Sequence, residues 1–157
     1  MNYIIRKAEK KDVPAIFALI KDLAEFEKAP NEVKITVDEL ERDGFGSDAV
    51  YKAFVAEAEG KIVGMAVYYI KYSTWKGKGV YLEDLIVMED YRRYGIGGKL
   101  FEAVVKAAKE LGVRKMDWQV LDWNTPAIEF YKRYNAVIAD EWLNGSLYEK
   151  QLKEFNG

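Results

Sequence analysis

Segment 91–100, which reads YRRYGIGGKL, constrains this chain most, because it places three glycines and two arginines between a strand-like apolar run and an amphipathic helix. Glycine lacks a Cβ, so its backbone N–H can approach a ligand closely. The first turn of the following helix adds unpaired amides and the positive end of the helix dipole. The segment therefore predicts an anion cradle, with phosphate or pyrophosphate as its natural occupant. The alternative is a glycine-rich turn that binds nothing.

Two well-known phosphate loops do not fit this segment. A P-loop needs Ser or Thr after its lysine to hold magnesium, and Leu100 follows Lys99 here. A dinucleotide fingerprint needs a third glycine in the place of Leu100, ideally in an N-terminal βαβ unit. The remaining pattern is Arg-x-x-Gly-x-Gly, formed by Arg92, Gly95 and Gly97, and it resembles the pyrophosphate loop of the GNAT acetyltransferases.

Length and charge indicate one globular domain with a small-molecule ligand. The chain has 157 residues, 50% of them hydrophobic, which suffices for one core, so we expect a single domain over residues 1–157. Lys plus Arg (24) nearly balances Asp plus Glu (26), with no basic block, so we expect no nucleic acid and no membrane as partner. Residues 1–6 read as a strand rather than a signal peptide, which predicts a cytoplasmic protein.

Cysteine and histidine are both absent from the chain. Their absence removes disulfides, thiolate and imidazole metal ligands, and Cys or Ser–His nucleophile pairs. We therefore expect no metal. Any proton transfer must use Glu, Asp, Tyr, Lys, water or the backbone.

The hydrophobic periodicity predicts a fold of the α/β (α+β) class. Strands are expected at 2–8, 50–58, 61–72, 79–88, 115–121, 136–138 and 146–152, and helices after Asp12, from Thr36 to about Arg42, from Leu100 to Leu111, and from Asn124 to about Tyr134. A capping box at Thr36 and Glu39 and a hairpin turn at 59–60 support these limits. This order matches the GNAT fold, a mixed, mostly antiparallel twisted sheet of about seven strands flanked by four helices.

Two further motifs extend the resemblance. They are YLEDLIVM at 81–88 and the pattern Asn124-x-Pro126-x-x-x-Phe130-Tyr131-Lys132. With the glycine loop they resemble the diamine N-acetyltransferases, which comprise the spermidine/spermine enzymes and their thialysine-acetylating relatives. The resemblance spans nearly the whole chain. It implies direct transfer from acetyl-CoA to a small primary amine, and a homodimer with the C-terminal strands at its interface.

Two departures bear on the acceptor. Ser73 stands where polyamine-type members carry an aspartate, whereas 120–124 (VLDWN) resembles the thialysine-type members. Short diamines and lysine-like amines therefore rank ahead of spermine.

The resemblance implies two catalytic residues. Glu83 would accept the proton of the acceptor ammonium, directly or through water; the alternative is a surface or ion-paired carboxylate. Tyr131 stands where family members place the phenol that protonates the departing CoA thiolate; the alternative is core packing. A phenol with a pKa of about 10 is a reasonable acid for a thiolate. Because no cysteine can carry a covalent acetyl group, a ternary complex is the remaining route.

The expected cofactor contacts fall into three groups. Backbone groups of strand 79–88 would bind the pantetheine arm, loop residues the pyrophosphate, and the helix after Asn124 the rest of the cofactor. These residues are Leu85, Ile86 and Val87; Arg92, Arg93, Tyr94, Gly95, Ile96, Gly97 and Gly98; and Asn124, Pro126, Ala127, Tyr131 and Lys132. A helix N-cap explains Asn124 equally well, and a solvated surface explains Lys132 equally well.

Carboxylates and aromatic side chains are expected to form the acceptor wall, because both suit an ammonium or a polymethylene chain. The candidates are Phe26, Glu27, Trp75, Glu83, Asp84, Asp117, Trp118, Gln119, Asp140, Glu141 and Trp142, with Glu27 and Asp84 foremost. On a chain with 32% charged residues, however, any one scattered acid is more often simply solvated. Two other functions stay open: acetylation of a protein or peptide amine, and a CoA-binding regulatory protein without catalysis.

Overall fold

The computed structural model describes residues 1–157, which form two compact units, 1–119 and 120–157. The first unit contains one five-stranded sheet in the order β1-β2-β3-β4-β5. Its strands are β1 Tyr3–Lys7, β2 Lys52–Ala58, β3 Lys61–Ser73, β4 Gly77–Val87 and β5 Met116–Asp117. The first four strands pair antiparallel in succession, whereas β5 joins β4 in parallel.

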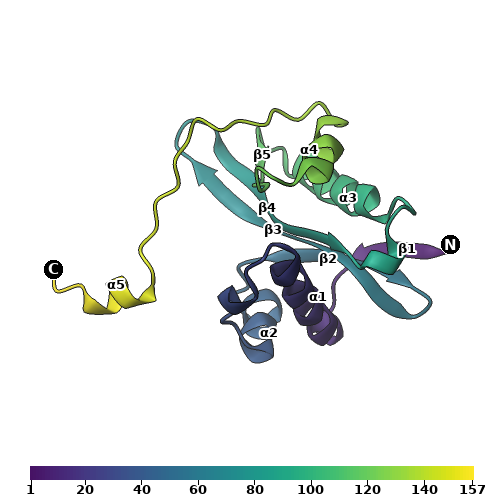
Figure 1. Ribbon diagram of the computed structural model, residues 1–157, viewed down its shortest axis with the longest axis horizontal. Coiled ribbons are helices and arrows are strands. Elements are labelled where there is room, and N and C mark those ends of the chain that lie inside the picture. The colour runs from purple at the N-terminus through teal and green to yellow at the C-terminus, as the bar shows by residue number, and fades with distance from the viewer. The chain divides into compact units, whose positions relative to one another are not determined.

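Three helices cover the sheet of the first unit. They are α1 Val13–Phe26, α2 Val37–Phe45 and α3 Ile96–Leu111, and short 3-10 turns occupy Lys10–Asp12, Pro30–Glu32 and Glu89–Tyr91. Helices α1 and α2 lie on one face of the sheet and α3 on the other (Figure 1). One core cluster joins α1 and α2 to inward-facing residues of β2, β3 and β4, including Val55, Met65 and Ile86. Both faces are therefore buried where the helices lie.

Several local predictions are confirmed. Thr36 and Glu39 form the expected capping box at α2: the Glu39 N–H donates to Thr36 Oγ1 at 3.1 Å and the Thr36 N–H donates to Glu39 Oε2 at 3.2 Å. Glu59 and Gly60 both have positive φ, at 54° and 74°, as a two-residue hairpin turn requires. Helix α3 ends at Gly112, whose φ is 69°.

Helix α2 is longer than the sequence predicts. It continues through Gly44 to Phe45 instead of ending near Arg42. The hydroxyl of Tyr51 donates to the carbonyl of Leu40, and a Cβ built on Gly44 would lie 2.2 Å from the Tyr51 ring. Gly44 therefore admits the Tyr51 ring against the helix and does not end it.

The expected count of about seven strands and four helices is wrong. The structure has five strands, because neither 136–138 nor 146–152 is a strand, and it has five helices. The expected strand 115–121 is present only as the two residues of β5. The second unit instead holds α4 Thr125–Lys132 and α5 Glu149–Glu154. No helix in either unit combines the length and apolar character that crossing a bilayer requires.

The C-terminal difference has a physical reason. An alternating apolar pattern becomes a strand only where another strand supplies ladder hydrogen bonds, and residues 136–157 pair with no strand of the sheet. In α5, Glu149 pairs with Lys153 one turn later, and the Tyr148 N–H donates to the side chain of Gln151 at 3.0 Å. These local contacts favour a helix.

Candidate active site

The edge of β4 that faces away from β3 is open over its carboxyl half. Strand β5 pairs with β4 only at Val80 and Tyr81, in the register Val80↔Met116 and Tyr81↔Asp117. Residues Leu85–Val87 therefore have a strand partner, β3, on one side only. An extended ligand can add to such an edge as a further strand.

The register of β3 and β4 determines which backbone groups reach the open edge. The Met88 N–H donates to the Val63 carbonyl at 2.8 Å, and Val87 lies opposite Gly64. This pattern makes Val87 a non-hydrogen-bonded position of the ladder, so its N–H and C=O point away from β3, as do those of Leu85 two residues earlier. The amide of Ile86 points toward β3. Leu85 and Val87 are thus the two positions able to pair with a ligand through their backbones.

The glycine loop delivers unpaired amides to the start of α3. Gly95 is the N-cap in the left-handed conformation, with φ of 80°, and no side chain caps the helix. The Lys99 N–H is the first to bond back, to the Gly95 carbonyl at 3.1 Å. The amides of Ile96–Gly98 thus receive no side-chain cap. A Cβ built on Gly97 would lie 3.7 Å from the Val87 side chain, so the cradle lies close to the end of β4. This arrangement fits the pyrophosphate of a CoA cofactor.

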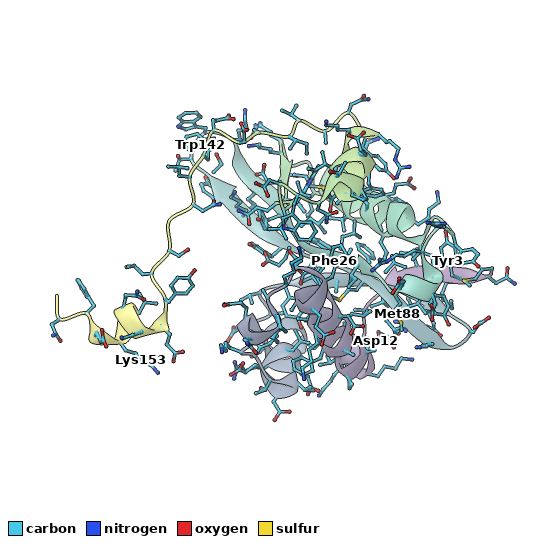
Figure 2. All side chains as sticks on the ribbon, in the orientation of Figure 1. Tyr3, Asp12, Phe26, Met88, Trp142 and Lys153 are labelled. Carbon is cyan, nitrogen blue, oxygen red and sulfur yellow. The ribbon has the colours of Figure 1, made fainter.

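Arg92 ties the loop to the rest of the first unit. Its Nε donates to the Val87 carbonyl at 3.0 Å, and its guanidinium carbon lies 5.8 Å from the centre of the Phe26 ring. Figure 2 shows Phe26 at one end of α1, with Asp12 at the other. Arg93 holds a left-handed conformation with φ of 71°, and Tyr94 is half exposed. Arg92 therefore joins the end of β4 to the end of α1.

A β-bulge lies at the centre of the candidate site. Val67 of β3 pairs with Asp84, and the next residue, Tyr68, pairs with Leu82, so Glu83 is an extra residue in β4. Bulges redirect side chains and are frequent beside active sites. Here the bulge leaves Glu83 exposed and Asp84 half-buried at consecutive positions.

Three carboxylates influence one another at this place. Burial, and then the charges of Glu83 and Glu27, together raise the pKa of Asp84 to about 6. Glu27, at the C-cap of α1, also has a raised pKa because it is half-buried. We call Glu27, Glu83 and Asp84 the acidic end. Such an excess of negative charge favours a cationic ligand.

Tyr69 is a contact that the sequence interpretation missed. Its hydroxyl donates to Glu83 Oε2 at 3.3 Å, and its ring lies 5.3 Å from that of Tyr81. Burial, and then the neighbouring Glu83 charge, raise the pKa of Tyr69 to about 12, so the phenol stays protonated and remains a donor. The contact could have been predicted from the sequence, because residues that alternate along two paired strands share one face of the sheet.

Asp117 and Trp118 have defined partners within the first unit. Asp117 forms ion pairs with Lys71 at 3.8 Å and Lys115 at 3.2 Å. The Trp118 ring meets Phe101 of α3 edge-on, with 5.3 Å between centroids. Asp117 therefore lies among cations, and Trp118 packs against a helix.

Two other predicted wall residues are exposed. Trp75 lies in the turn between β3 and β4, is 92% exposed, and donates its N–H to Ser73 Oγ at 3.2 Å. Gln119 is also exposed.

In the second unit the predicted helix cap is present. Asn124 Oδ1 accepts from the Ala127 N–H at 3.3 Å, and Pro126 occupies the first turn of α4. The cap therefore explains Asn124 by itself.

The remaining predicted residues of this unit differ in exposure. Tyr131 is buried, and its ring lies 5.2 Å from that of Phe130. Lys132 is exposed and pairs with Glu129 at 3.7 Å, whereas Glu141 lies exposed beyond α4. Tyr131 is therefore the one buried side chain among these residues.

Comparison with known proteins places the chain among acetyltransferases. Residues 13–136 match the Acetyltransferase (GNAT) family. The chain is 42% identical over 141 residues to a thialysine N-epsilon-acetyltransferase of Bos taurus, covering 85% of this chain and 83% of the relative. It is 36% identical to the human Spermidine/spermine N(1)-acetyltransferase-like protein 1 over 87% of this chain and 21% of that protein. An integron cassette protein from V. cholerae, 21% identical, shares the fold with a TM-score of 0.79 over 98% of this chain and 97% of its own.

Fold and sequence together define an acetyltransferase. The chain belongs to the GNAT family. Its activity is N-acetyl transfer, and its five-stranded mixed sheet with five helices is a form of the GNAT fold.

Proposed function

We propose that this protein transfers the acetyl group of acetyl-CoA directly to a primary amine of a small diamine, polyamine or lysine-like molecule. One observation carries the proposal: the open edge of β4 leads from the acidic end at the bulge to the uncapped start of α3. A thioester cofactor and a cationic acceptor are the ligands whose chemistry this arrangement matches. The names of the thialysine and spermidine/spermine relatives support the same class of acceptor.

The first unit supplies cofactor contacts through its backbone. Leu85 and Val87 would hold the pantetheine arm as an added strand, with one N–H polarising the thioester carbonyl, and the amides of Ile96–Gly98 would hold the pyrophosphate. Acetyl-CoA supplies the activated acyl group. Arg92 keeps the cradle against β4, and Arg93 adds positive charge beside it.

Glu83 is the proposed proton acceptor for the acceptor ammonium, and Asp84 is a second candidate because its pKa of about 6 lies close to neutral pH. If Asp84 must be ionised, kcat/KM rises as the pH passes about 6. The profiles of Glu83→Gln and Asp84→Asn separate the two roles. If only Asp84→Asn removes the inflection of the kcat/KM profile near pH 6, Asp84 is the base. If only Glu83→Gln abolishes the rate, Glu83 is the base.

Tyr131 is the proposed acid that protonates the departing thiolate. Tyr131→Phe should lower kcat by about 100-fold, within the usual range for one acid–base group, with unchanged CoA binding. Phe130→Leu is the matched control, because it changes a ring beside Tyr131 and leaves the phenol in place. An unchanged rate in Tyr131→Phe rejects this role.

The decisive experiment measures release of CoA from acetyl-CoA with thialysine, lysine, short diamines, spermidine and a histone-like peptide as acceptors. Turnover with a small amine supports the proposal, and turnover with the peptide alone favours a protein acetyltransferase. Tight CoA binding without turnover favours a regulatory CoA-binding protein. The proposed reaction needs no metal, so EDTA should leave the rate unchanged.

We further propose that residues 1–157 act as one cytoplasmic domain and that the chain is a homodimer. In the second unit Trp142 and Leu143 are 81% and 97% exposed, and isolated soluble chains rarely leave such apolar side chains grouped in water. A second copy of the chain would cover them. Sedimentation equilibrium should give a dimer that Trp142→Ser weakens, and a monomer at micromolar concentration would overturn this.

A further inference from the structure

Beyond Glu83, the same face of the sheet continues toward the hairpin end of β3 and β4. Tyr69 and Lys71 alternate along β3, and Tyr81 lies opposite Tyr69 on β4. Residues two apart on a strand share a face. The contacts agree: Tyr69 reaches Glu83 at 3.3 Å, the two tyrosine rings are 5.3 Å apart, and Lys71 Nζ lies 5.2 Å from the centre of the Tyr81 ring. These four side chains form one continuous row.

The far end of this row is basic. Lys71 and Lys115 share one carboxylate, Asp117, at 3.8 Å and 3.2 Å. Two cations for one anion leave a net positive charge, and an ammonium has three donors, so Lys71 keeps donors for a ligand. We call Lys71, Lys115 and Asp117 the basic end. The charge along the row therefore changes sign between the acidic end and the basic end.

The spacing of the two ends sets a length for the acceptor. Lys71 lies opposite Gly79, four residues before Glu83 on β4, which corresponds to about 13 Å of strand. A long-chain amino acid, with an amine at the tip of its side chain, has about this length when one hydrogen bond of about 3 Å is added at each end. Its reacting amine would lie at the acidic end. Its α-carboxylate would reach Lys71.

A simple diamine fits the row less well. Its second ammonium would lie beside two lysines and a single carboxylate that those lysines already occupy. Like charges at such distances disfavour binding.

We propose that Lys71 is a specificity residue that selects acceptors carrying a carboxylate at the end opposite the reacting amine, so that the enzyme acts on amino acids with a side-chain amine in preference to diamines. This inference rests on the proposed function, acetylation of a small amine. It gives a role to a side chain that the family resemblance does not address.

The test compares pairs of acceptors that differ only in the carboxylate. L-lysine is paired with cadaverine, its decarboxylated counterpart, and thialysine with its own decarboxylated form. Values of kcat/KM are measured for the natural chain and for Lys71→Gln. Lys78→Gln is the matched control, because Lys78 is an exposed lysine of the same hairpin that pairs with Tyr72, a residue on the opposite face from Lys71.

The natural chain should prefer each amino acid over its diamine. Lys71→Gln should lower kcat/KM for the amino acids about tenfold, as expected for loss of one charge-assisted hydrogen bond, and leave the diamines unchanged or improved. Lys78→Gln should keep the natural preference. An unchanged amino acid to diamine ratio in Lys71→Gln, or equal rates for both acceptors in the natural chain, overturns the inference while the proposed function stands. No turnover of any small amine, despite acetyl-CoA binding, overturns both.

Discussion

Two groups of acids in the first unit have opposite surroundings. Asp12, at the start of α1, is 4% exposed and accepts from Arg6 Nη1 at 2.8 Å, from Arg6 Nη2 at 3.0 Å and from the Glu9 N–H at 2.7 Å. Glu57 accepts from the same arginine at 2.9 Å. We call Asp12, Arg6 and Glu57 the Asp12 cluster. The Arg6 hydrogen bonds hold the pKa of Asp12 below its usual range despite its burial.

At the acidic end the same chemical group has no such partner. Asp84 forms no ion pair, and its pKa is raised to about 6 by burial, then by Glu83 and Glu27. Asp12 is thus arranged to stay charged within the fold, whereas Asp84 is arranged to bind a proton or a cation. The difference teaches that burial alone does not identify a functional acid. A raised pKa without a counter-charge makes an acid a candidate, because binding a cation would then offset its unpaired charge.

The largest effect should come from breaking the Asp12 cluster. Asp12→Ala leaves Arg6 partly buried with one of its two acids and removes the N-terminal contact to Glu9. We expect the free energy of unfolding to fall by about 3–5 kcal/mol, the usual result of removing one partner of a buried pair. Urea unfolding measures this. Asp22→Ala, at an exposed acid of the same helix, should change stability by about 0.5 kcal/mol or less.

The pH dependence of that loss has a definite sign. A lowered folded-state pKa contributes stability above the unfolded pKa, near 4, and this contribution is lost as the pH falls through the folded value. The difference between Asp12→Ala and the natural chain should therefore shrink below about pH 4. A difference that stays constant with pH would mean that the charge of Asp12 is not what stabilises α1.

The second largest effect should be an increase in stability, caused by replacing Asp84. Because the folded pKa of Asp84 is raised, the folded chain holds its proton more tightly, and stability falls as the pH rises from about 4 through about 6. Asp84→Asn removes this cost and should stabilise the protein at pH 8 by up to about 3 kcal/mol. The gain should vanish near pH 4, and activity should fall. Thermal unfolding at both pH values measures this, and a destabilised variant at pH 8 would contradict the comparison.

Local sequence rules predicted the features whose causes are local. The capping box at Thr36, the turn at 59–60 and the end of α3 at Gly112 depend on backbone preferences that neighbouring residues determine. The consecutive acids Glu83 and Asp84 could likewise be selected as candidates. These features need no knowledge of the tertiary structure.

The remaining features depend on partners distant in sequence. The bulge at Glu83 results from the register between β3 and β4, and the Tyr69 contact follows from that register. The length of α2 depends on Tyr51, and the C-terminal residues 136–157 lack the strand partner that their alternating pattern anticipates. A single sequence does not specify such pairings.

A moderate loss of activity is expected at Glu83, the acid that most resembles those of the Asp12 cluster because a side chain donates to it. Glu83 is the one member of the acidic end with a side-chain donor, Tyr69, at 3.3 Å. Tyr69→Phe should lower kcat/KM about threefold to tenfold, corresponding to about 1 kcal/mol for one hydrogen bond, with little change in stability. Tyr72→Phe, at an exposed hydroxyl on the opposite face of β3, is the control. In a Glu83→Gln background the Tyr69→Phe effect should disappear, and its persistence would show that Tyr69 acts through another group.

The smallest effect tests whether the acids of the acidic end act on one another. Glu27 is the weakest of the three causes that raise the pKa of Asp84, after burial and Glu83. Glu27→Gln should therefore lower the pKa of Asp84 only slightly, moving the acid limb of the kcat/KM profile to lower pH if Asp84 is the base. Carbon-13 NMR of the Asp84 carboxyl measures the shift without reference to activity. Glu25→Gln, an exposed acid two residues earlier on α1, should leave it unchanged. Equal shifts in both variants would mean that the end of α1 raises the pKa of Asp84 through its overall negative charge. The position of the Glu27 carboxylate would then not matter.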